Sequence, residues 1–326
     1  MNYDIPQISV IMSVYNTFPE YLSASINSIL KQTFTDFEFL ITDDCGNLET
    51  RIQLEKYAKT DTRIHLIINQ NNIGLTKSLN EMLRISKGKY IARMDADDIS
   101  RPNRLQEQFD YMETHSQYAV IGCKFSSTRS YISFPFHWND NMEIRRINLL
   151  FFNDGICHPT AFFRKSFLTD NQIEYNPQIK KSQDYSMWVS IAEMGGKIGL
   201  CPHNLFFYRI HPGQISSKNH EDQMIYEHII IHNQLDRFDQ NICDKDSNLL
   251  YHFYRGEITN EEEKLLAVLK KLVILNKQKQ IYDSHLFMSE IKKIWKIAAI
   301  KQAVKLKRYK MISMIIKIDR EIDDLN

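Results

Sequence analysis

The sequence has few of the features that mark several large classes of protein. Its five cysteines stand singly and form no CxxC pair, which argues against a disulfide framework or a structural zinc site and favours a reducing compartment. No stretch has the uninterrupted apolar length of a membrane-spanning helix, and the first residues, MNYDIPQISV, do not read as a signal peptide. Forty-one basic and forty acidic residues give a net charge of +1. We therefore expect a cytoplasmic protein that does not bind nucleic acid.

Glycine is also scarce. The 326 residues include 10 glycines and contain neither a GxGxxG nor a GxxxxGK[ST] run. Such runs let backbone amides surround a phosphate group, so this way of binding phosphate is excluded. If the ligand carries phosphate, its charge must be neutralised by other means, and a divalent metal ion is one.

Short apolar runs alternate with segments of helical spacing from residue 7 onward. QISVIMSVY, FEFLITDD, RIHLIIN, KYIARMDA and AVIGCKF are typical of buried strands, and residues 21–32, 50–59, 76–85 and 101–115 are typical of helices. This alternation predicts an α/β fold with a mostly parallel sheet and helices on both of its faces. Ligands of such sheets bind at the carboxyl ends of the strands.

The pattern changes near residue 218. Beyond it, long segments without glycine or proline, such as EEEKLLAVLKKLVILNKQKQ, predict a helical appendage. We therefore expect two domains, residues 1–218 and residues 219–326.

Acidic residues follow two of the predicted strands. The most concentrated group is MDADD, which contains Asp95, Asp97 and Asp98. Asp95 and Asp97 are two apart in extended backbone and therefore project to the same side. A calcium loop of the EF-hand type is excluded, because Ser100 and Gln106 stand where that loop needs glycine and glutamate. Three interpretations remain: a solvated turn that caps the next helix, a phosphatase-like aspartate nucleophile, and a site where a divalent metal binds a nucleoside diphosphate.

Six segments together resemble the family 2 glycosyltransferases, which have the GT-A fold. They are ISVIMSVYN, SINSILKQTFTDFEFLITDD, NNIGLTKSLNEML, GKYIARMDADDISRPNRLQEQ, SQDYSMWVSIAEMGG and YRIHPGQIS, and they extend from about residue 7 to about residue 217 in the order of the family. The combination is specific, although each segment alone is not.

The resemblance implies a role for each matching residue. The acidic motif would hold Mn²⁺ or Mg²⁺ and the ribose and diphosphate of a sugar nucleotide, and the pair in TDD would receive the nucleobase. The implied sites are the metal ligands Asp97, Asp98 and His211; the nucleotide contacts Ser13, Tyr15, Asp43, Asp44, Asp95 and Asp97; the general base Asp184; and the acceptor or donor-sugar region at His158 and Gln183.

Several of these residues also have simpler interpretations. Tyr15 could pack at a strand end, and His158 and His211 could be hydrogen-bonded histidines of the core or rim. Asp184 could cap the helix that it begins. The sequence also departs from the family, because Cys45 and Gly46 follow the first acidic pair in place of glycine and serine, and Gln183 stands where glutamate is common.

These inferences predict a metal-dependent, inverting glycosyltransferase of the hexosyltransferase class. The expected donor is a UDP-sugar and the expected acceptor is a glycan or lipid-linked hydroxyl, in bacterial surface polysaccharide synthesis. Two alternatives stay open: an inactive nucleotide-sugar-binding or scaffold protein, and an aspartate-nucleophile phosphatase. The basic residues between 292 and 310 are interleaved with apolar ones. They indicate either peripheral contact with the inner face of a membrane or a homodimer formed through the C-terminal helices.

Overall fold

The structure is a computed structural model that describes residues 5–128, 130–134, 139–212, 220–240, 242, 244–255 and 261–306. The chain folds as two compact units, one made of residues 1–138 and 155–220 and the other of residues 139–154 and 221–326. Residues 139–154 thus belong to the second unit, although they lie inside the segment 1–218. The domain limits given from the sequence stay a prediction.

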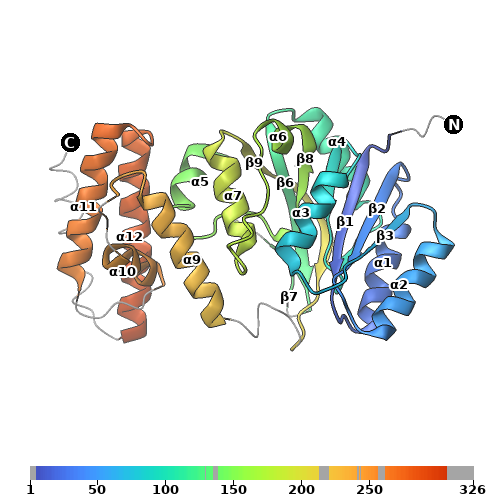
Figure 1. Cartoon of the computed structure of the whole chain (residues 1–326). Coiled ribbons are helices and arrows are strands. Elements are labelled where there is room, and N and C mark those ends of the chain that lie inside the picture. Colours follow the sequence, from blue (N-terminus) through green and yellow to red (C-terminus); the bar gives the residue numbers. More distant parts are fainter. Residues whose placement is uncertain are drawn as a thin grey trace. The chain divides into compact units, whose positions relative to one another are not determined.

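The first unit contains the sheet and the helices that cover it (Figure 1). Its strands are β1 (Ile8–Val14), β2 (Phe37–Asp43), β3 (Ile64–Ile68), β4 (Tyr90–Arg93), β5 (Ile99–Ser100), β6 (Tyr118–Ser127), β7 (Ser130–Phe134), β8 (Phe162–Arg164) and β9 (Lys197–Tyr208). Its helices are α1 (Pro19–Leu30), α2 (Leu48–Thr60), α3 (Leu75–Ile85), α4 (Arg104–Thr114), α6 (Lys165–Asp170), α7 (Gln183–Glu193) and the short 3-10 helix η1 (His158–Thr160).

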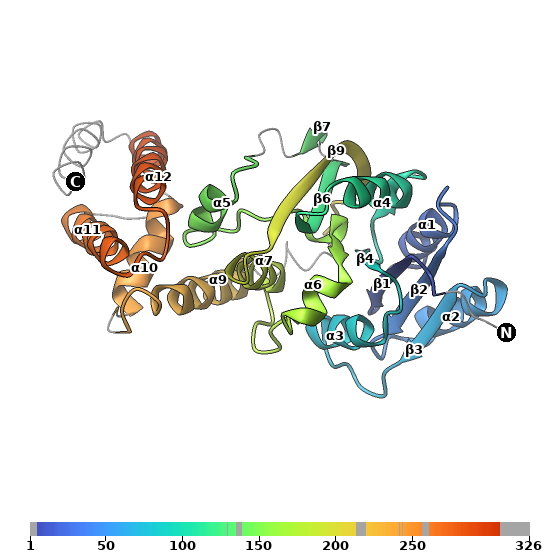
Figure 2. The same ribbon diagram turned by 90° about the horizontal axis from the view of Figure 1, so that it is seen from above.

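The sheet has the order β3-β2-β1-β4-β8-β6-β9-β5, and β7 pairs with β6. The neighbours from β3 to β4 are all parallel, as predicted, whereas β8 is antiparallel to both β4 and β6, and β5 is antiparallel to β9. Figure 2 shows α1 and α4 on one face and α3 and α6 on the other. The predicted α/β class with helices on both faces is confirmed, with a parallel first half and a mixed second half.

Local sequence explains why the parallel half forms. β1 and β2 are buried along almost their whole length, as expected for strands covered on both faces. α1 begins with Pro19, which suits the first position of a helix, and it turns Leu22, Ile26 and Ile29 into the core. Gly88 connects α3 to β4, where a Cβ atom would lie 2.5 Å from the backbone nitrogen of Ser9. Only glycine permits this close approach of two backbones.

The second unit is helical, as predicted for the C-terminal region. Its helices are α5 (Met142–Asn148), α9 (His220–Leu235), α10 (Asp244–Tyr254), α11 (Glu262–Lys279) and α12 (Ser284–Leu306). Gln234 of α9 donates a hydrogen bond to the carbonyl of Leu149, and the Arg146 guanidinium lies 4.6 Å from the ring centroid of Tyr282. These contacts explain why residues 139–154 fold with the C-terminal helices. No helix of the described ranges combines the length and the apolar composition needed to cross a membrane.

Candidate functional site

The acidic loop, which contains Asp95, Asp97 and Asp98, follows β4 and is paired with a buried arginine. The guanidinium of Arg93, which is 2% exposed, donates one hydrogen bond to each carboxylate oxygen of Asp95, and the Nη1–Oδ2 distance is 2.7 Å. The Ser25 hydroxyl donates to the backbone carbonyl of Asp95 at 2.7 Å. Burying a charge is costly unless it is paired, so this pair fixes the first aspartate of the loop.

The three aspartates of the loop converge. Asp95, Asp97 and Asp98 each place one carboxylate oxygen within 4.8 Å of the others. Asp98 is fully buried, and its Oδ1 accepts a hydrogen bond from the backbone nitrogen of Arg209 at 2.8 Å. Its Oδ2 is buried without a hydrogen-bond partner in the described structure. Burial, together with the charges of Asp95 and Asp97, raises the pKa of Asp98 well above its usual value.

His211 joins this cluster from a distant part of the chain. Its Nε2 lies 2.9 Å from Oδ2 of Asp97, and its side chain is 11% exposed. Carboxylate oxygens and an imidazole nitrogen are a suitable ligand set for Mn²⁺, and the cluster contains one buried oxygen without a partner. The residues present therefore fit a divalent cation. The structure brings together the proposed ligands Asp97, Asp98 and His211, and their role at a metal stays a prediction.

The acids that follow β2 make hydrogen bonds within the protein. Asp43 is buried, and its carboxylate accepts from the backbone nitrogen of Gly46 at 2.8 Å and pairs with Arg51. Asp44 is 2% exposed and accepts from the Nδ2 of Asn69 and from two backbone amides, those of residues 73 and 74, at 2.8–2.9 Å. Both carboxylates thus organise the loops at this sheet edge, and their contact with a nucleobase stays a prediction.

The end of β1 lies beside the end of β2. The strands are in register, with Ser13 opposite Thr42 and Val14 opposite Asp43. Tyr15, the next residue, is 53% exposed. A core packing role would bury this ring, so the exposed fraction favours a surface where a flat ligand can stack.

Asp184 and His158 both act on Tyr175. Asp184 is in the first turn of α7 and Ser182 is at its N-cap position, so Asp184 is not the cap residue. Burial is the main cause of the raised pKa of Asp95 and of Tyr175, and the charge of Asp184 adds to both shifts. The Nε2 of His158 is 2.7 Å from the Tyr175 hydroxyl, and burial followed by the charge of Arg93 lowers the pKa of His158 well below its usual value.

Three residues of the site were not identified from the sequence: Arg93, Tyr175 and Arg209. Arg93 could have been identified, because it is the one charge in the apolar run YIARM between Lys89 and Asp95, and a charge inside a buried strand needs a partner. Arg209 donates its Nε to the carbonyl of Asp97 at 2.7 Å. The sequence gives no signal that distinguishes Tyr175 from the other tyrosines.

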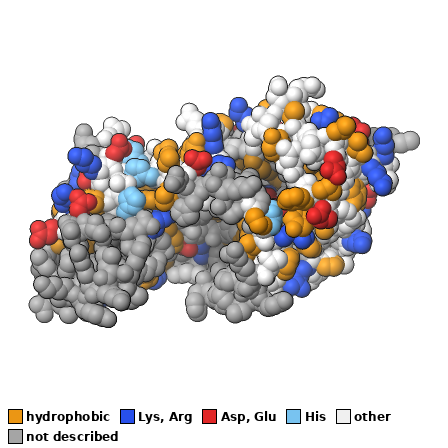
Figure 3. Space-filling view, turned by 90° about the horizontal axis from the view of Figure 1, so that it is seen from below, with side chains coloured by type: hydrophobic (Ala, Val, Ile, Leu, Met, Phe, Trp, Pro, Cys, Tyr) orange, Lys and Arg blue, Asp and Glu red, His pale blue; other side chains and the backbone are white. Residues whose placement is uncertain are grey.

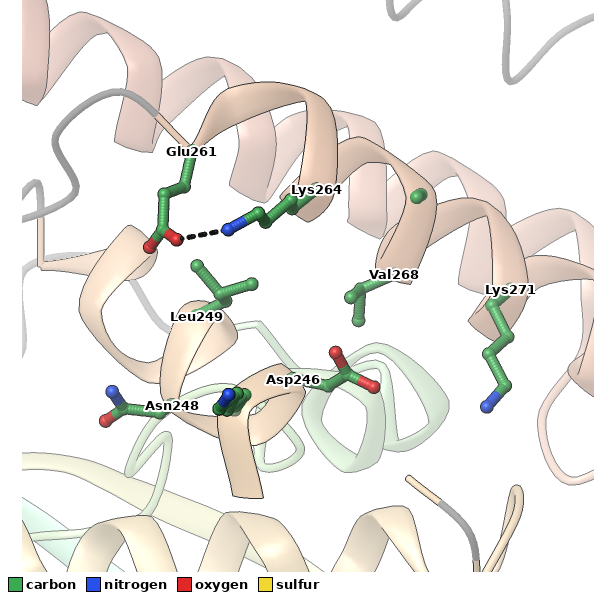
Figure 4. Close-up of a pocket in the computed structure, with 9 residues that line it drawn as sticks. Asp246, Asn248, Leu249, Glu261, Lys264, Val268 and Lys271 are labelled. Atoms are coloured by element: carbon green, nitrogen blue, oxygen red, sulfur yellow. Dashed lines mark hydrogen bonds and ion pairs between the residues drawn. The ribbon is translucent and has the colours of Figure 1, made fainter. Parts of the chain in front are cut away.

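Figure 3 shows acidic, apolar and histidine side chains close together on one face of the α/β unit. A cavity of about 520 Å³ lies elsewhere, between α10 and α11 of the helical unit. Leu249 and Val268 form part of its apolar wall, and Glu261 pairs with Lys264 at 2.8 Å (Figure 4). None of the predicted site residues lines this cavity.

The comparisons with known proteins identify the family. The profile of glycosyl transferase family 2 matches residues 9–171, half of the chain. An uncharacterized glycosyltransferase of Methanocaldococcus jannaschii is 33% identical over 64% of this chain and 72% of its own length. A UDP-Glc:alpha-D-GlcNAc-diphosphoundecaprenol beta-1,3-glucosyltransferase of Escherichia coli is 29% identical over 66% of this chain and 81% of its own length. The chain belongs to glycosyltransferase family 2, and it is a glycosyltransferase.

Solved structures support the GT-A fold. Residues 1–349 of Staphylococcus aureus TarS, in complex with UDP-GlcNAc, superpose with a TM-score of 0.59 at 16% identity, over 93% of each chain. A mannosyltransferase of Pyrobaculum calidifontis, in complex with GDP-Man and Mn²⁺, superposes with a TM-score of 0.54 at 13% identity, over 90% of this chain and 88% of its own. At these identities the likeness concerns the fold alone.

Proposed function

We propose that the chain is a metal-dependent, inverting glycosyltransferase that transfers a sugar from a UDP-sugar to a hydroxyl of a glycan or lipid-linked acceptor. The observation that carries the proposal is the convergence of three carboxylates and His211, with a buried oxygen of Asp98 that has no partner within the described structure. Asp97, Asp98 and His211 would hold Mn²⁺ or Mg²⁺. A bound divalent ion supplies positive charge to a departing diphosphate.

The donor nucleotide would lie along the carboxyl ends of β1, β2 and β4. Tyr15 offers an exposed ring for stacking on the base, and Ser13 lies beside it on β1. Asp43 and Asp44 accept hydrogen bonds from the amides of the loops that follow β2 and precede α3. Asp95 is already bound by Arg93, so we assign it to the ribose and diphosphate region and not to the metal.

Asp184 would act as the general base. The acceptor oxygen attacks the anomeric carbon, its proton passes to the Asp184 carboxylate, and the bond between that carbon and the diphosphate oxygen breaks with its electron pair leaving on the diphosphate. A single displacement of this kind inverts the anomeric centre. The electrostatic effect of Asp184 on Asp95 supports this role, because the base must act where donor and acceptor meet. Gln183 and the buried His158, which lies 2.7 Å from the Tyr175 hydroxyl, would shape the sugar side of the site.

We place the reaction in bacterial surface polysaccharide synthesis, at the cytoplasmic face of the membrane. Support comes from the acceptor in the name of the Escherichia coli relative, a diphosphoundecaprenol-linked sugar. Further support comes from α12, where Ile297 and Ile300 are exposed in a segment that carries Lys292, Lys293 and Lys296. Basic and apolar side chains together suit an anionic lipid surface.

A panel of sugar nucleotides tests the proposal. Calorimetric titration with UDP-, GDP- and other nucleotide sugars, each with and without Mn²⁺, should give metal-dependent binding of one UDP-sugar. Release of UDP should then rise when the correct acceptor is added. Binding of no nucleotide sugar under either condition would contradict the proposal, and tight binding without any turnover would favour the inactive binding protein.

A further inference from the structure

The three residues after β9 form a short segment over the acidic loop, and we call Arg209–His211 the clasp. Arg209 donates its backbone nitrogen to Asp98 Oδ1 at 2.8 Å and its Nε to the Asp97 carbonyl at 2.7 Å. His211 reaches the Asp97 carboxylate at 2.9 Å. The backbone nitrogen of Ile210, between them, donates to the hydroxyl of Thr128 at 3.0 Å. The clasp thus connects the residue that follows β6 to the acidic loop.

One ring lies against both outer residues of the clasp. The guanidinium carbon of Arg209 lies 4.2 Å from the ring centroid of Tyr21, and the imidazole of His211 is 5.2 Å from the same centroid. Phe18 packs edge-on against Tyr21 at 5.6 Å and against His211 at 6.3 Å. The Tyr21 ring therefore borders the two side chains that hold the clasp against the loop.

Tyr21 itself has a fixed position. It lies in the first turn of α1, where the Phe18 carbonyl accepts hydrogen bonds from the backbone nitrogens of Tyr21 and Leu22, both at 3.0 Å. Leu22 is fully buried in the core of the sheet unit. An anchored helix end can thus hold the aromatic ring in place while the side chains of the clasp rest on it.

We propose that Tyr21 is a positioning residue for the metal site: its ring holds Arg209 and His211 in the orientation that binds the cation. The inference rests on the proposed metal dependence and extends it to a residue that does not touch the metal. A cation–π contact and a pre-oriented ligand each contribute modestly to binding, so losing the ring should weaken metal-dependent nucleotide binding by about tenfold. The aromatic ring, and not the hydroxyl, should carry this effect.

The test compares UDP affinity with and without Mn²⁺ in the full chain. Tyr21→Leu should lose about a factor of ten in the presence of Mn²⁺ and nothing in its absence, and Tyr21→Phe should behave as the unmutated protein does. Tyr111→Leu is the matched control, because it removes a tyrosine that stacks on His115, at 4.1 Å between centroids, in α4. Direct titration of Mn²⁺ followed by electron paramagnetic resonance gives a readout that does not depend on UDP.

The outcomes separate the two proposals. If Tyr21→Leu binds UDP and Mn²⁺ as the unmutated protein does, while Asp97→Asn has lost metal-dependent binding, the role of Tyr21 is wrong and the metal site stands. If the unmutated protein shows no metal dependence, both proposals are wrong. Should Tyr21→Leu unfold at a lower temperature than Tyr111→Leu, Tyr21→Met provides a second change that removes the ring, and Mn²⁺ binding by this variant equal to that of the unmutated protein would overturn the inference.

Discussion

The Nε2 atom of His211 lies 2.9 Å from the Oδ2 atom of Asp97, although 114 positions separate the two residues in the chain. The contact joins the segment after β9 to the loop after β4. It places a nitrogen ligand beside an oxygen ligand, next to the buried Asp98. This geometry makes the metal prediction testable at single side chains.

Asp97→Asn should remove metal-dependent binding of UDP. The amide keeps the size of the side chain and can still accept a hydrogen bond from His211, but it loses the charge that a divalent cation needs. Changes around metal ligands commonly cost ten- to a hundredfold in affinity, so the loss at a ligand should reach about a hundredfold or more. Calorimetric titration of UDP with and without Mn²⁺ measures it.

Asp36 is exposed and precedes β2, so Asp36→Asn is the control for a change of charge alone. Asp98→Asn should have the same effect on binding, but Asp98 is fully buried, so its thermal unfolding must be compared with that of the unmutated protein. Equal affinity for UDP in both conditions, in the unmutated protein, would remove the metal from the mechanism.

Asp184→Asn should separate binding from catalysis. Asn has nearly the same shape as Asp but cannot take the acceptor proton, and a positioned general base typically contributes about a hundredfold to ten-thousandfold in rate. We expect nearly unchanged Mn²⁺ and UDP binding and a loss of transfer of that size. Initial rates of UDP release with acceptor measure it. Near-normal transfer by the folded variant would show that another group is the base.

The parallel half of the fold could be predicted from the sequence because its strands are short, apolar and separated by helical periods. The second half could not be predicted in the same detail. β8 has three residues and β5 has two, lengths at which neither hydrophobic period is visible, and both pair antiparallel. The position of residues 139–154 in the helical unit depends on contacts such as that between Gln234 and Leu149, which join residues 85 positions apart.

In the predicted site, too, the features set by local sequence could be predicted and those set by distant contacts could not. Asp95, Asp97 and Asp98 are close in sequence, so their convergence could be predicted from local spacing. The resemblance to a family, and not the spacing, identified His211. The hydrogen bonds of Asp44 with residues 69–74 were not expected, because an acid at a strand end looks the same whether it binds a ligand or a loop.

The contribution of His158 to the stability of the protein should fall as the pH drops below about 6.5, the usual pKa of histidine. Burial lowers the pKa of His158 well below that value, so the unfolded chain takes up a proton that the folded chain does not. The contribution of His158 to the free energy of unfolding is therefore fully present above pH 6.5. It decreases toward acid by about 1.4 kcal/mol per pH unit for one proton. Burial lowers the pKa of His228 as well, which adds to the slope in the helical unit.

His158→Gln tests the assignment of this slope. The Gln amide can keep a hydrogen bond with the Tyr175 hydroxyl, but it does not titrate. Urea unfolding between pH 8 and pH 5 should show a pH dependence that is smaller by about one proton in the variant. Identical slopes in the two proteins would show that His158 does not contribute.

The α12 segment should bind anionic lipid. Ile297 and Ile300 are 41% and 55% exposed, and each lysine near an anionic surface contributes about 1 kcal/mol. Lys292→Gln with Lys296→Gln leaves Lys293 to pair with Glu290, at 3.1 Å, and should weaken binding to phosphatidylserine-containing vesicles by roughly thirtyfold. The matched control is Lys56→Gln with Lys59→Gln, two exposed positions of α2, which should leave vesicle binding unchanged.

Vesicle sedimentation at low salt measures this binding. Added salt should weaken the binding, because exposed charges are screened. If the intact protein does not sediment with anionic vesicles at low salt, membrane binding is wrong, and a dimer seen by analytical ultracentrifugation would then assign the exposed isoleucines to a contact between two copies of the chain.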